Sequence, residues 1–488
     1  MVWRLAAVTA SLLVMPGCLA IGPSYEAPEA ETDAAWAGLE EGVFNAASPE
    51  SIHTWWTELN DPVLDGLIER AFASNLDLAS ALAAVRQAAA LRRVSAGERF
   101  PDIDGTGSYS RERQGVNGFP ALPDPEDFDS FALGLEFGWE LDVWGRVSRL
   151  VEAADADLAA TVEDLHDVRL ILAAEVATEY VALRTAQSRV RVAERNIEIQ
   201  RRSLDLTQKR FEAGASPQLD VSQAETNLAN TEAELPTLRA DVRLQLLRLA
   251  VLLGENPTAL LGELSIGGRV PEPPIEIAVG IPADALRRRP DVRSSERTLA
   301  AEVARIGVEL GDLYPRFVLG GSFQFNATDA DMLFEGDSVG WGLGPSFSWN
   351  LFDGGRQRGE VRAQEAAADI ALLAYRSSVL RAIEEVEGAM FRHARELERA
   401  EALGRASASA RRSAELSREL YLEGRSDFQN VLDSERELFA AEDNLIVSRA
   451  EVVLTYITLQ RALGGGWSSG VDGSSEQYEP EGGLEAER

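Results

Sequence analysis

FALGLEFGWELD spans Phe131 to Asp142, and its side chains alternate strictly between two kinds. The even positions, from Ala132 to Asp142, are small or acidic. The odd positions are large and apolar: Phe131, Leu133, Leu135, Phe137, Trp139 and Leu141. A period of two predicts a β-strand with one apolar face and one polar face. Such a strand needs an apolar medium on one side and water on the other.

A second stretch, later in the chain, repeats this pattern. VGWGLGPSFSWNL, from Val339 to Leu351, has Val, Trp, Leu, Pro, Phe, Trp and Leu at its odd positions and Gly, Ser or Asn at its even ones. The segments that begin at Pro101 and Arg316 also alternate, less cleanly. We therefore predict two β-hairpins, one over residues 101–142 and one over residues 315–351.

The predicted strands have the length and the pattern of membrane-spanning strands. A tilted strand needs about 9–11 residues to cross the hydrocarbon core of a bilayer. Apolar-out and polar-in alternation is typical of a transmembrane barrel. The polar side here is also small, which predicts an open lumen with Glu136, Glu140 and Asp142 on its wall. The alternative is a soluble sandwich with one wet face, and the Trp residues near the strand ends argue against it.

The chain carries an internal duplication with a constant offset. WELDVWGR begins at Trp139 and WNLFDGGR begins at Trp349, 210 positions later. The same offset relates Gly214 to Gly424 within two further similar stretches. Two unrelated stretches that keep one offset predict two structural repeats with the same order of elements.

A long helical hairpin is predicted after each strand pair. Residues 146–213 contain neither Pro nor Gly, and at 1.5 Å per residue they predict a rod of roughly 100 Å. Residues 357–423 are the second copy of this rod. Apolar residues recur every seventh position in both return helices, which indicates coiled-coil packing. The two series are Val221, Leu228, Leu235, Val242 and Leu249, and Val431, Leu438, Leu445, Val452 and Leu459.

The turns between these helices are short. Gly214 and Gly424 stand where a helix ends in the left-handed conformation. Ser216 and Ser426 stand where an N-cap is expected, and Pro217 stands at the first helical position. We predict tight reversals near 214–216 and 424–426.

The charge of the chain excludes one class of partner. Asp and Glu number 80 against 47 Lys and Arg, which gives a formal net charge of -33. Nucleic acid is excluded as a partner, because its phosphates would be repelled. A strongly acidic chain fits a solvated surface or a conduit that favours cations.

The N-terminus predicts a lipoprotein signal. Arg4 precedes an apolar run from Leu5 to Met15, which is too short to span a bilayer but suits a signal-peptide core. Gly17 precedes Cys18, the single cysteine of the chain. We expect Cys18 to be acylated and to become the mature N-terminus, with an ordinary signal peptide as the alternative. One lipidated cysteine anchors a chain to a membrane surface without making it integral.

Four strands are too few to close a barrel, since single-chain bacterial barrels begin at eight. An open sheet edge cannot face lipid. If the strands span a membrane, the chain must therefore assemble. Two copies would supply eight strands and three copies would supply twelve, and the strand pattern does not choose between them.

The chain resembles the TolC-like outer-membrane efflux factors, in particular the NodT-type lipoprotein branch that serves resistance–nodulation–division pumps. The similar stretches run in order from Cys18 to about Leu463: CLAIGPSYEAP, WWTELNDPVLDGLIERAFASNLDL, FGWELDVWGR, RFEAGASPQLDVSQAE, LAVLLGENP, IPADALRRRPDVRSSE and YLEGRSDFQNVLDSE. The resemblance implies a fold of mainly α-helix with transmembrane β-strands.

The same resemblance implies an assembly and a function. Three copies would form a homotrimer whose twelve-stranded β-barrel crosses the outer membrane and continues into a periplasmic α-helical barrel. The trimer would be a passive duct for small molecules such as drugs. It would work with a periplasmic membrane-fusion adaptor and an inner-membrane pump, and would need no cofactor or metal.

The resemblance also implies a periplasmic gate at the turns. Tyr421 and Asp433 match the family pattern at the second turn, and Asp220 matches it at the first. Ser426 stands where the family has Arg, and Asn430 where it has Asp, which removes a salt bridge expected between neighbouring turns. The residues for a hydrogen bond between Tyr421 and Asp220 are kept, and this bond is the expected turn-to-turn contact. The turn residues Gly214, Ser216, Gly424 and Ser426 would contact the adaptor.

Other functions fit the sequence less well. His53, His166 and His393 lie far apart, and the chain has no HExxH pattern, so an enzyme is not expected. A duct for type I protein secretion or for metal-ion efflux uses the same fold and stays an alternative. A periplasmic coiled-coil lipoprotein that forms no channel is the second alternative.

The predicted organisation places the signal peptide at residues 1–17 and an extended lipidated segment at 18–58. The first repeat then occupies 59–268, the second repeat 269–463, and an acidic tail 464–488.

Overall fold

The computed structural model describes residues 20–29, 33–48, 52–113, 127–265 and 267–467. The predicted signal peptide, Cys18 and nearly all of the predicted acidic tail lie outside the described residues.

The chain divides into two compact units. Unit 1 comprises Met1–Pro28, Val85–Thr161 and Ser295–Tyr375, and unit 2 comprises Glu29–Ala84, Val162–Ser294 and Arg376–Arg488. Each unit therefore takes segments from both predicted repeats. The division falls inside the following helices: α3 (Leu76–Gly97), α4 (Arg146–Glu212), α7 (Pro290–Gly311) and α8 (Arg356–Leu422).

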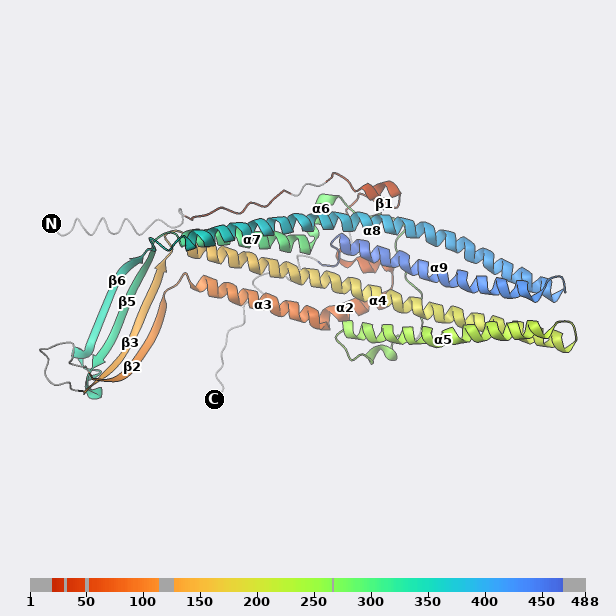
Figure 1. The fold of residues 1–488 in the computed structure, drawn as a ribbon, viewed down its shortest axis with the longest axis horizontal. Helices are drawn as coiled ribbons and strands as arrows, with labels where there is room; N and C mark the ends of the chain where they lie inside the picture. Colours follow the sequence, from red (N-terminus) through yellow and green to blue (C-terminus); the bar gives the residue numbers. More distant parts are fainter. Residues whose placement is uncertain (1–19, 30–32, 49–51, 114–126, 266, 468–488) are drawn as a thin grey trace. The chain divides into compact units, whose positions relative to one another are not determined.

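Unit 1 holds an antiparallel four-stranded sheet, in the order β2–β3–β5–β6 (Figure 1). Its strands are β2 (Asp102–Arg113), β3 (Asp127–Leu141), β5 (Arg316–Ala327) and β6 (Val339–Ser348). β3 pairs with β5, which joins the two predicted hairpins and leaves β2 and β6 as edges. β6 ends at Ser348 and not at Leu351 as predicted, because its partner strand begins at Arg316, opposite Ser348.

The register sorts the side chains of the sheet onto two faces. Odd residues pair with odd residues across the whole sheet, and even residues with even ones. One face is therefore apolar, with pairs such as Leu135 opposite Phe323 and Phe323 opposite Trp341. The other face is small or polar, and it places Asp104 opposite Glu136. The alternation predicted from the sequence is confirmed.

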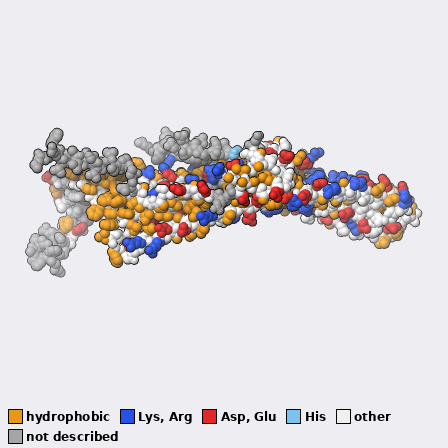
Figure 2. Space-filling model, turned by 90° about the horizontal axis from the view of Figure 1, so that it is seen from above, with side chains coloured by type: hydrophobic (Ala, Val, Ile, Leu, Met, Phe, Trp, Pro, Cys, Tyr) orange, Lys and Arg blue, Asp and Glu red, His pale blue; other side chains and the backbone are white. Residues whose placement is uncertain are grey.

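The apolar face of the sheet is exposed in the single chain. Trp341, Leu343 and Phe347 are each at least two-thirds exposed. Figure 2 shows hydrophobic side chains gathered over the strands of unit 1 and the adjoining helix starts. An apolar area of this kind indicates a surface that another apolar phase covers.

The predicted long helices are confirmed, and the two copies have equal lengths. α4 and α8 each have 67 residues, and the return helices α5 (Gln218–Leu252) and α9 (Phe428–Ala462) each have 35. In unit 2 the two return helices lie alongside the ends of α4 and α8, with both turns at the same end (Figure 1).

The first of the two heptad series is only partly buried within one chain, whereas the second is buried except for Leu445. Val221 and Leu249 at the ends of the first series are buried, whereas Leu228, Leu235 and Val242 between them are half-buried. The half-buried residues keep part of their apolar surface exposed, and further helices could pack against it. This supports packing against further copies of the chain.

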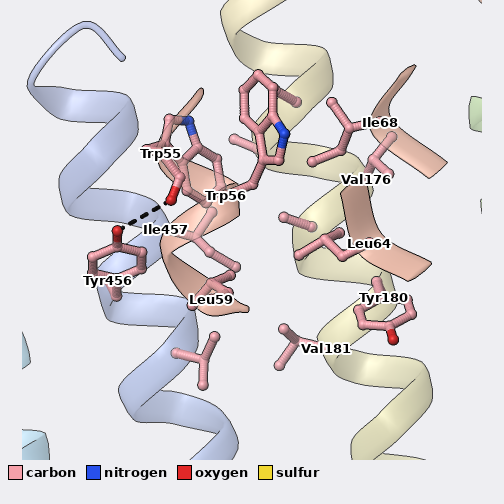
Figure 3. Close-up of a cluster of buried hydrophobic side chains, with 14 of the residues drawn as sticks. Trp55, Trp56, Leu59, Leu64, Ile68, Val176, Tyr180, Val181, Tyr456 and Ile457 are labelled. Atoms are coloured by element: carbon pink, nitrogen blue, oxygen red, sulfur yellow. Dashed lines mark hydrogen bonds between the residues drawn. The ribbon is translucent and has the colours of Figure 1, made fainter. Parts of the chain in front are cut away.

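The core of unit 2 is built around aromatic side chains (Figure 3). Trp55 and Trp56, from the 3₁₀ helix η3 (Ile52–Leu59), meet edge to face with ring centroids 5.8 Å apart. The Tyr456 hydroxyl, from α9, donates to the carbonyl oxygen of Trp55 over 3.3 Å. This core fixes the N-terminal segment against α4 and α9.

Shorter elements complete the two units. Unit 2 contains η2 (Ala37–Glu41), α2 (Pro62–Ser74), η5 (Ala259–Leu261), α6 (Pro282–Arg288) and a parallel pair of β1 (Phe44–Asn45) with β4 (Ile277–Ala278). Unit 1 contains η6 (Ala330–Met332) and η7 (Gly336–Ser338). Among the described residues, no helix combines the length and the apolar character needed to cross a membrane.

Candidate functional site at the helical turns and the polar sheet face

The two helical turns have the same hydrogen-bonded geometry. Gly214 and Gly424 have φ of 72° and 70°, the left-handed conformation that glycine adopts without strain. The amide of Ala215 donates to the carbonyl of Arg210, and the amide of Arg425 donates to that of Leu420, over 2.7 and 2.8 Å. These bonds form a Schellman motif at the end of α4 and of α8. The predicted helix-ending glycines are confirmed.

The predicted helix starts are wrong by one residue at each turn. The N-cap of α5 is Pro217, and the N-cap of α9 is Asp427, and both have extended backbones. Ser216 and Ser426 therefore lie outside the helices and cap neither one. The Ser216 hydroxyl instead donates back to the carbonyl of Thr207, in α4, over 3.4 Å.

Tyr421 is a core residue of the turn region. Its side chain is buried in a cluster with Ala224, Phe428, Val431 and Leu432. Its ring lies 5.3 Å from that of Phe428, measured between centroids. The Tyr421 hydroxyl has no hydrogen-bond partner among the described residues, so the expected bond to Asp220 is not formed within one chain. The ring points into the apolar cluster, and this orientation is the reason.

Arg210, which sequence reasoning missed, joins the ends of α4 and α8. Its guanidinium carbon lies 4.6 Å from the centroid of the Tyr421 ring. Its Nη1 donates to the carbonyl of Tyr421 over 2.8 Å and to that of Leu422 over 3.5 Å. A cation at a helix C-terminus is stabilised by the helix dipole and by the free carbonyl groups there.

Of the remaining candidate gate residues, Asn430 and Asp433 are exposed and Asp220 is half-buried. Asn430 donates to the Ser426 hydroxyl over 3.0 Å, so the two residues that depart from the family pattern contact one another. Asp433 is exposed and accepts a hydrogen bond from Gln429 over 2.9 Å. Desolvation and the nearby Asp427 carboxylate raise the pKa of Asp220, and Arg210 opposes this shift.

The polar face of the sheet carries a cluster of carboxylates. A recess of about 500 Å³ in unit 1 is lined by residues that include Glu98, Asp102, Asp104, Glu136 and Glu140. Glu136 is exposed and lies opposite Asp104 in the register. Like charges that face each other repel, so this part of the sheet attracts cations.

Two of the three predicted lumen carboxylates have local partners instead. Glu140 accepts two hydrogen bonds from Arg146, each of 2.8 Å. Asp142 accepts from the backbone amides of Val147 and Ser148, over 3.0 and 2.8 Å, and so caps the start of α4. Glu140 is thus ion-paired and Asp142 acts as a helix cap, whereas Glu136 is exposed. Their place on a lumen wall stays a prediction. No cluster of three or more His, Cys, Asp or Glu side chains suited to a metal ion occurs in the part of the chain that the structure describes.

The comparisons with known proteins agree with this geometry. The outer membrane efflux protein family model matches twice, over residues 67–255 and 281–465. Nodulation protein T of Rhizobium leguminosarum bv. trifolii is 31% identical over 458 residues, which cover 93% of this chain and 96% of that protein. The solvent efflux pump outer membrane protein SrpC of Pseudomonas putida is 31% identical over 467 residues, which cover 94% and 97%.

The solved structures agree as well. The outer-membrane channel OprN has a TM-score of 0.86 and 36% identity, over 92% of this chain and 99% of that one. The predicted family and fold are confirmed, and a channel in place of an enzyme is what the family implies. The chain belongs to the outer membrane efflux protein family.

Proposed function

We propose that three copies of this chain form the outer-membrane duct of a tripartite efflux system, which passes small molecules to the exterior. The observation that carries this proposal is the sheet of unit 1. Its odd face is apolar and exposed, and its even face is small and acidic. That combination suits lipid on one side and a water-filled passage on the other.

The sheet edges support assembly. β2 and β6 each have one unpaired side, and unpaired backbone groups are costly in hydrocarbon. Pairing β6 of one copy with β2 of the next satisfies both edges and closes a ring. Three copies give twelve strands, the number that the family resemblance implies.

We propose that the periplasmic entrance lies at the turns of the two helical hairpins. The helix ends next to these turns carry the candidate gate residues Asp220, Tyr421, Asn430 and Asp433. In a threefold ring each carboxylate is repeated three times around one axis, and such charges repel at a constriction. Gly214, Ser216, Gly424 and Ser426 form the outer ends of the turns, and these are the surfaces we propose for the adaptor.

We propose that Cys18 carries the lipid anchor. Ala20, two residues later, lies against Gly145, where any side chain would come within 2.8 Å of the Ala20 Cα. Gly145 lies between the end of β3 and the start of α4. The first described residue after Cys18 therefore lies at the junction of β3 and α4, which we propose faces the membrane surface.

We propose that small molecules are the cargo and that an inner-membrane pump selects them. The relative SrpC is named as part of a solvent efflux pump. The duct itself supplies a cation-attracting wall, for which we propose Glu136 as the principal free carboxylate.

The test is to purify the full chain from outer membranes and record it in planar bilayers. We expect a species of trimer size that dissociates on boiling, and channels that select cations over anions. A monomer that forms no channels would contradict the proposal and would favour the coiled-coil lipoprotein.

A further inference from the structure

We propose that Arg210 is the latch that holds the two hairpins of one protomer together in the closed channel. This inference rests on the proposed gate at the helical turns. It concerns a single residue of α4 whose three contacts all lie on the end of α8.

The position of Arg210 makes it a bridge between the hairpins. Arg210 lies in the last turn of α4, where its own carbonyl accepts the bond from Ala215 that closes the Schellman motif. Its side chain leaves that turn and covers the corresponding turn of α8, at Tyr421 and Leu422. The end of α4 cannot move away from the end of α8 without breaking these contacts.

The contacts are of the kinds that are strong when shielded from water. A guanidinium over an aromatic face is held by the ring quadrupole, and more strongly where both are desolvated. Tyr421 is only 3% exposed, and the Arg210 Nε atom is buried without a partner among the described residues. Hydrogen bonds from a charged donor are stronger than those between neutral groups. Opening the contact would expose the ring and return Arg210 to water.

The duplication makes this latch one-sided. Residue 420 occupies in α8 the place that Arg210 occupies in α4, since both carbonyls close the Schellman bond. Residue 420 is Leu, which has no charge and no donor. The second copy therefore cannot return the contact. We infer that Arg210 holds the turn ends of α4 and α8 together, and that opening there requires its release. Farther along the helices, the two hairpins are also joined by Ser203 with Glu435 and by Asn227 with Arg436.

The latch also explains how the gate closes without the family's arginine. Ser426 takes that position and bonds to Asn430, within its own turn. Arg210 supplies the cation from the other hairpin. Its charge also acts on Asp220. Burial raises the pKa of Asp220, and Arg210 offsets part of that rise.

The experiment is single-channel recording of the full trimer with Arg210→Met, which keeps the aliphatic stem and removes the charge. We expect the open fraction at rest to rise about tenfold, as the loss of one cation–π contact and one charged hydrogen bond implies. Lys209→Met is the matched control, because Lys209 is an exposed cation that pairs with Asp205 on its own helix. It should leave the open fraction unchanged. Arg210→Lys keeps a cation but not the planar fork, and should fall between the two.

Two results would overturn the latch. One is an open fraction in Arg210→Met equal to that of the parent, and the other is an equal rise in the Lys209→Met control. If Arg210→Met fails to assemble, Arg210→Lys decides, because an open fraction equal to the parent's refutes the latch. A further variant, Asp433→Ala, shows whether only the latch is refuted or the proposed gate at the turns is refuted as well. If Asp433→Ala changes conduction while Arg210→Met does not, the proposed gate is supported and the latch is refuted. If neither variant changes conduction, the constriction lies elsewhere along the helices.

Discussion

The Arg289 guanidinium donates from Nη1 to the carbonyl oxygen of Ala462 over 3.0 Å. Arg289 is the single residue between α6 and α7, and Ala462 is the last residue of α9. The first repeat has the same arrangement. Asn75, the single residue between α2 and α3, donates to the carbonyl of Leu252, the last residue of α5, over 2.8 Å. In each repeat, the joint between two short helices therefore caps the end of the return helix.

We predict that the cap of the second repeat stabilises the protein more than that of the first. Arg289 is 7% exposed and also pairs with Asp291 and Glu385, both over 2.7 Å. Arg289→Met breaks this network and should cost about 3 kcal/mol. Asn75→Ala removes neutral hydrogen bonds and should cost about 1–2 kcal/mol. Chemical denaturation in detergent measures both. Arg287→Met, at an exposed neighbour, is the control; an equal loss there would refute a specific role for the cap.

His393 makes the stability of unit 2 sensitive to acid. Burial lowers the pKa of His393 to about 4, from an ordinary value of 6.5. The unfolded chain therefore binds a proton first, and stability falls as the pH drops from about 6.5 to about 4. The loss should reach roughly 3 kcal/mol. His393→Gln should reduce the slope in this range. A slope that is unchanged in His393→Gln would show that other groups cause the acid sensitivity.

Glu136 should set part of the cation preference. It is exposed on the polar face of the sheet, opposite Asp104. Glu136→Gln should lower the ratio of potassium to chloride permeability by up to about fivefold in dilute salt, since a charge near a passing ion is worth about 1 kcal/mol in water. The reversal potential in a salt gradient measures this. Glu272→Gln makes the same charge change in an exposed loop of unit 2 and should have no effect; equal shifts in both variants would mean that Glu136 does not line the passage.

Local sequence predicted most of the fold. The period of two in FALGLEFGWELD specified the strand and its faces, because the register pairs only residues of equal parity. The absence of Pro and Gly over residues 146–213 predicted a helix that the structure ends at Glu212. Gly214 and Gly424 predicted the helix ends, since few other residues adopt the left-handed conformation without strain.

The contacts of the site could not be predicted in the same way. Arg210 lies 211 residues before Tyr421, and nothing in its local sequence marks a partner on another helix. The expected bond from Tyr421 to Asp220 is not formed within one chain, where the Tyr421 ring lies against Phe428. Glu140 and Asp142 fit the alternation, but Glu140 pairs with Arg146 and Asp142 caps the start of α4. Tertiary contacts, which leave no periodic signal, decide each of these cases.

The central claim is that one face of the sheet meets lipid and the other meets water, and two substitutions on β6 test it most directly. Leu343 is 68% exposed on the apolar face, and Ser346 lies three residues on, on the polar face. An arginine at mid-bilayer on the lipid face costs about 2–4 kcal/mol. The measurement is the fraction of each variant that reaches the outer membrane as a trimer resistant to unheated detergent. We predict that Ser346→Arg assembles as the parent does and that Leu343→Arg is strongly reduced. Equal assembly of the two variants would contradict the account.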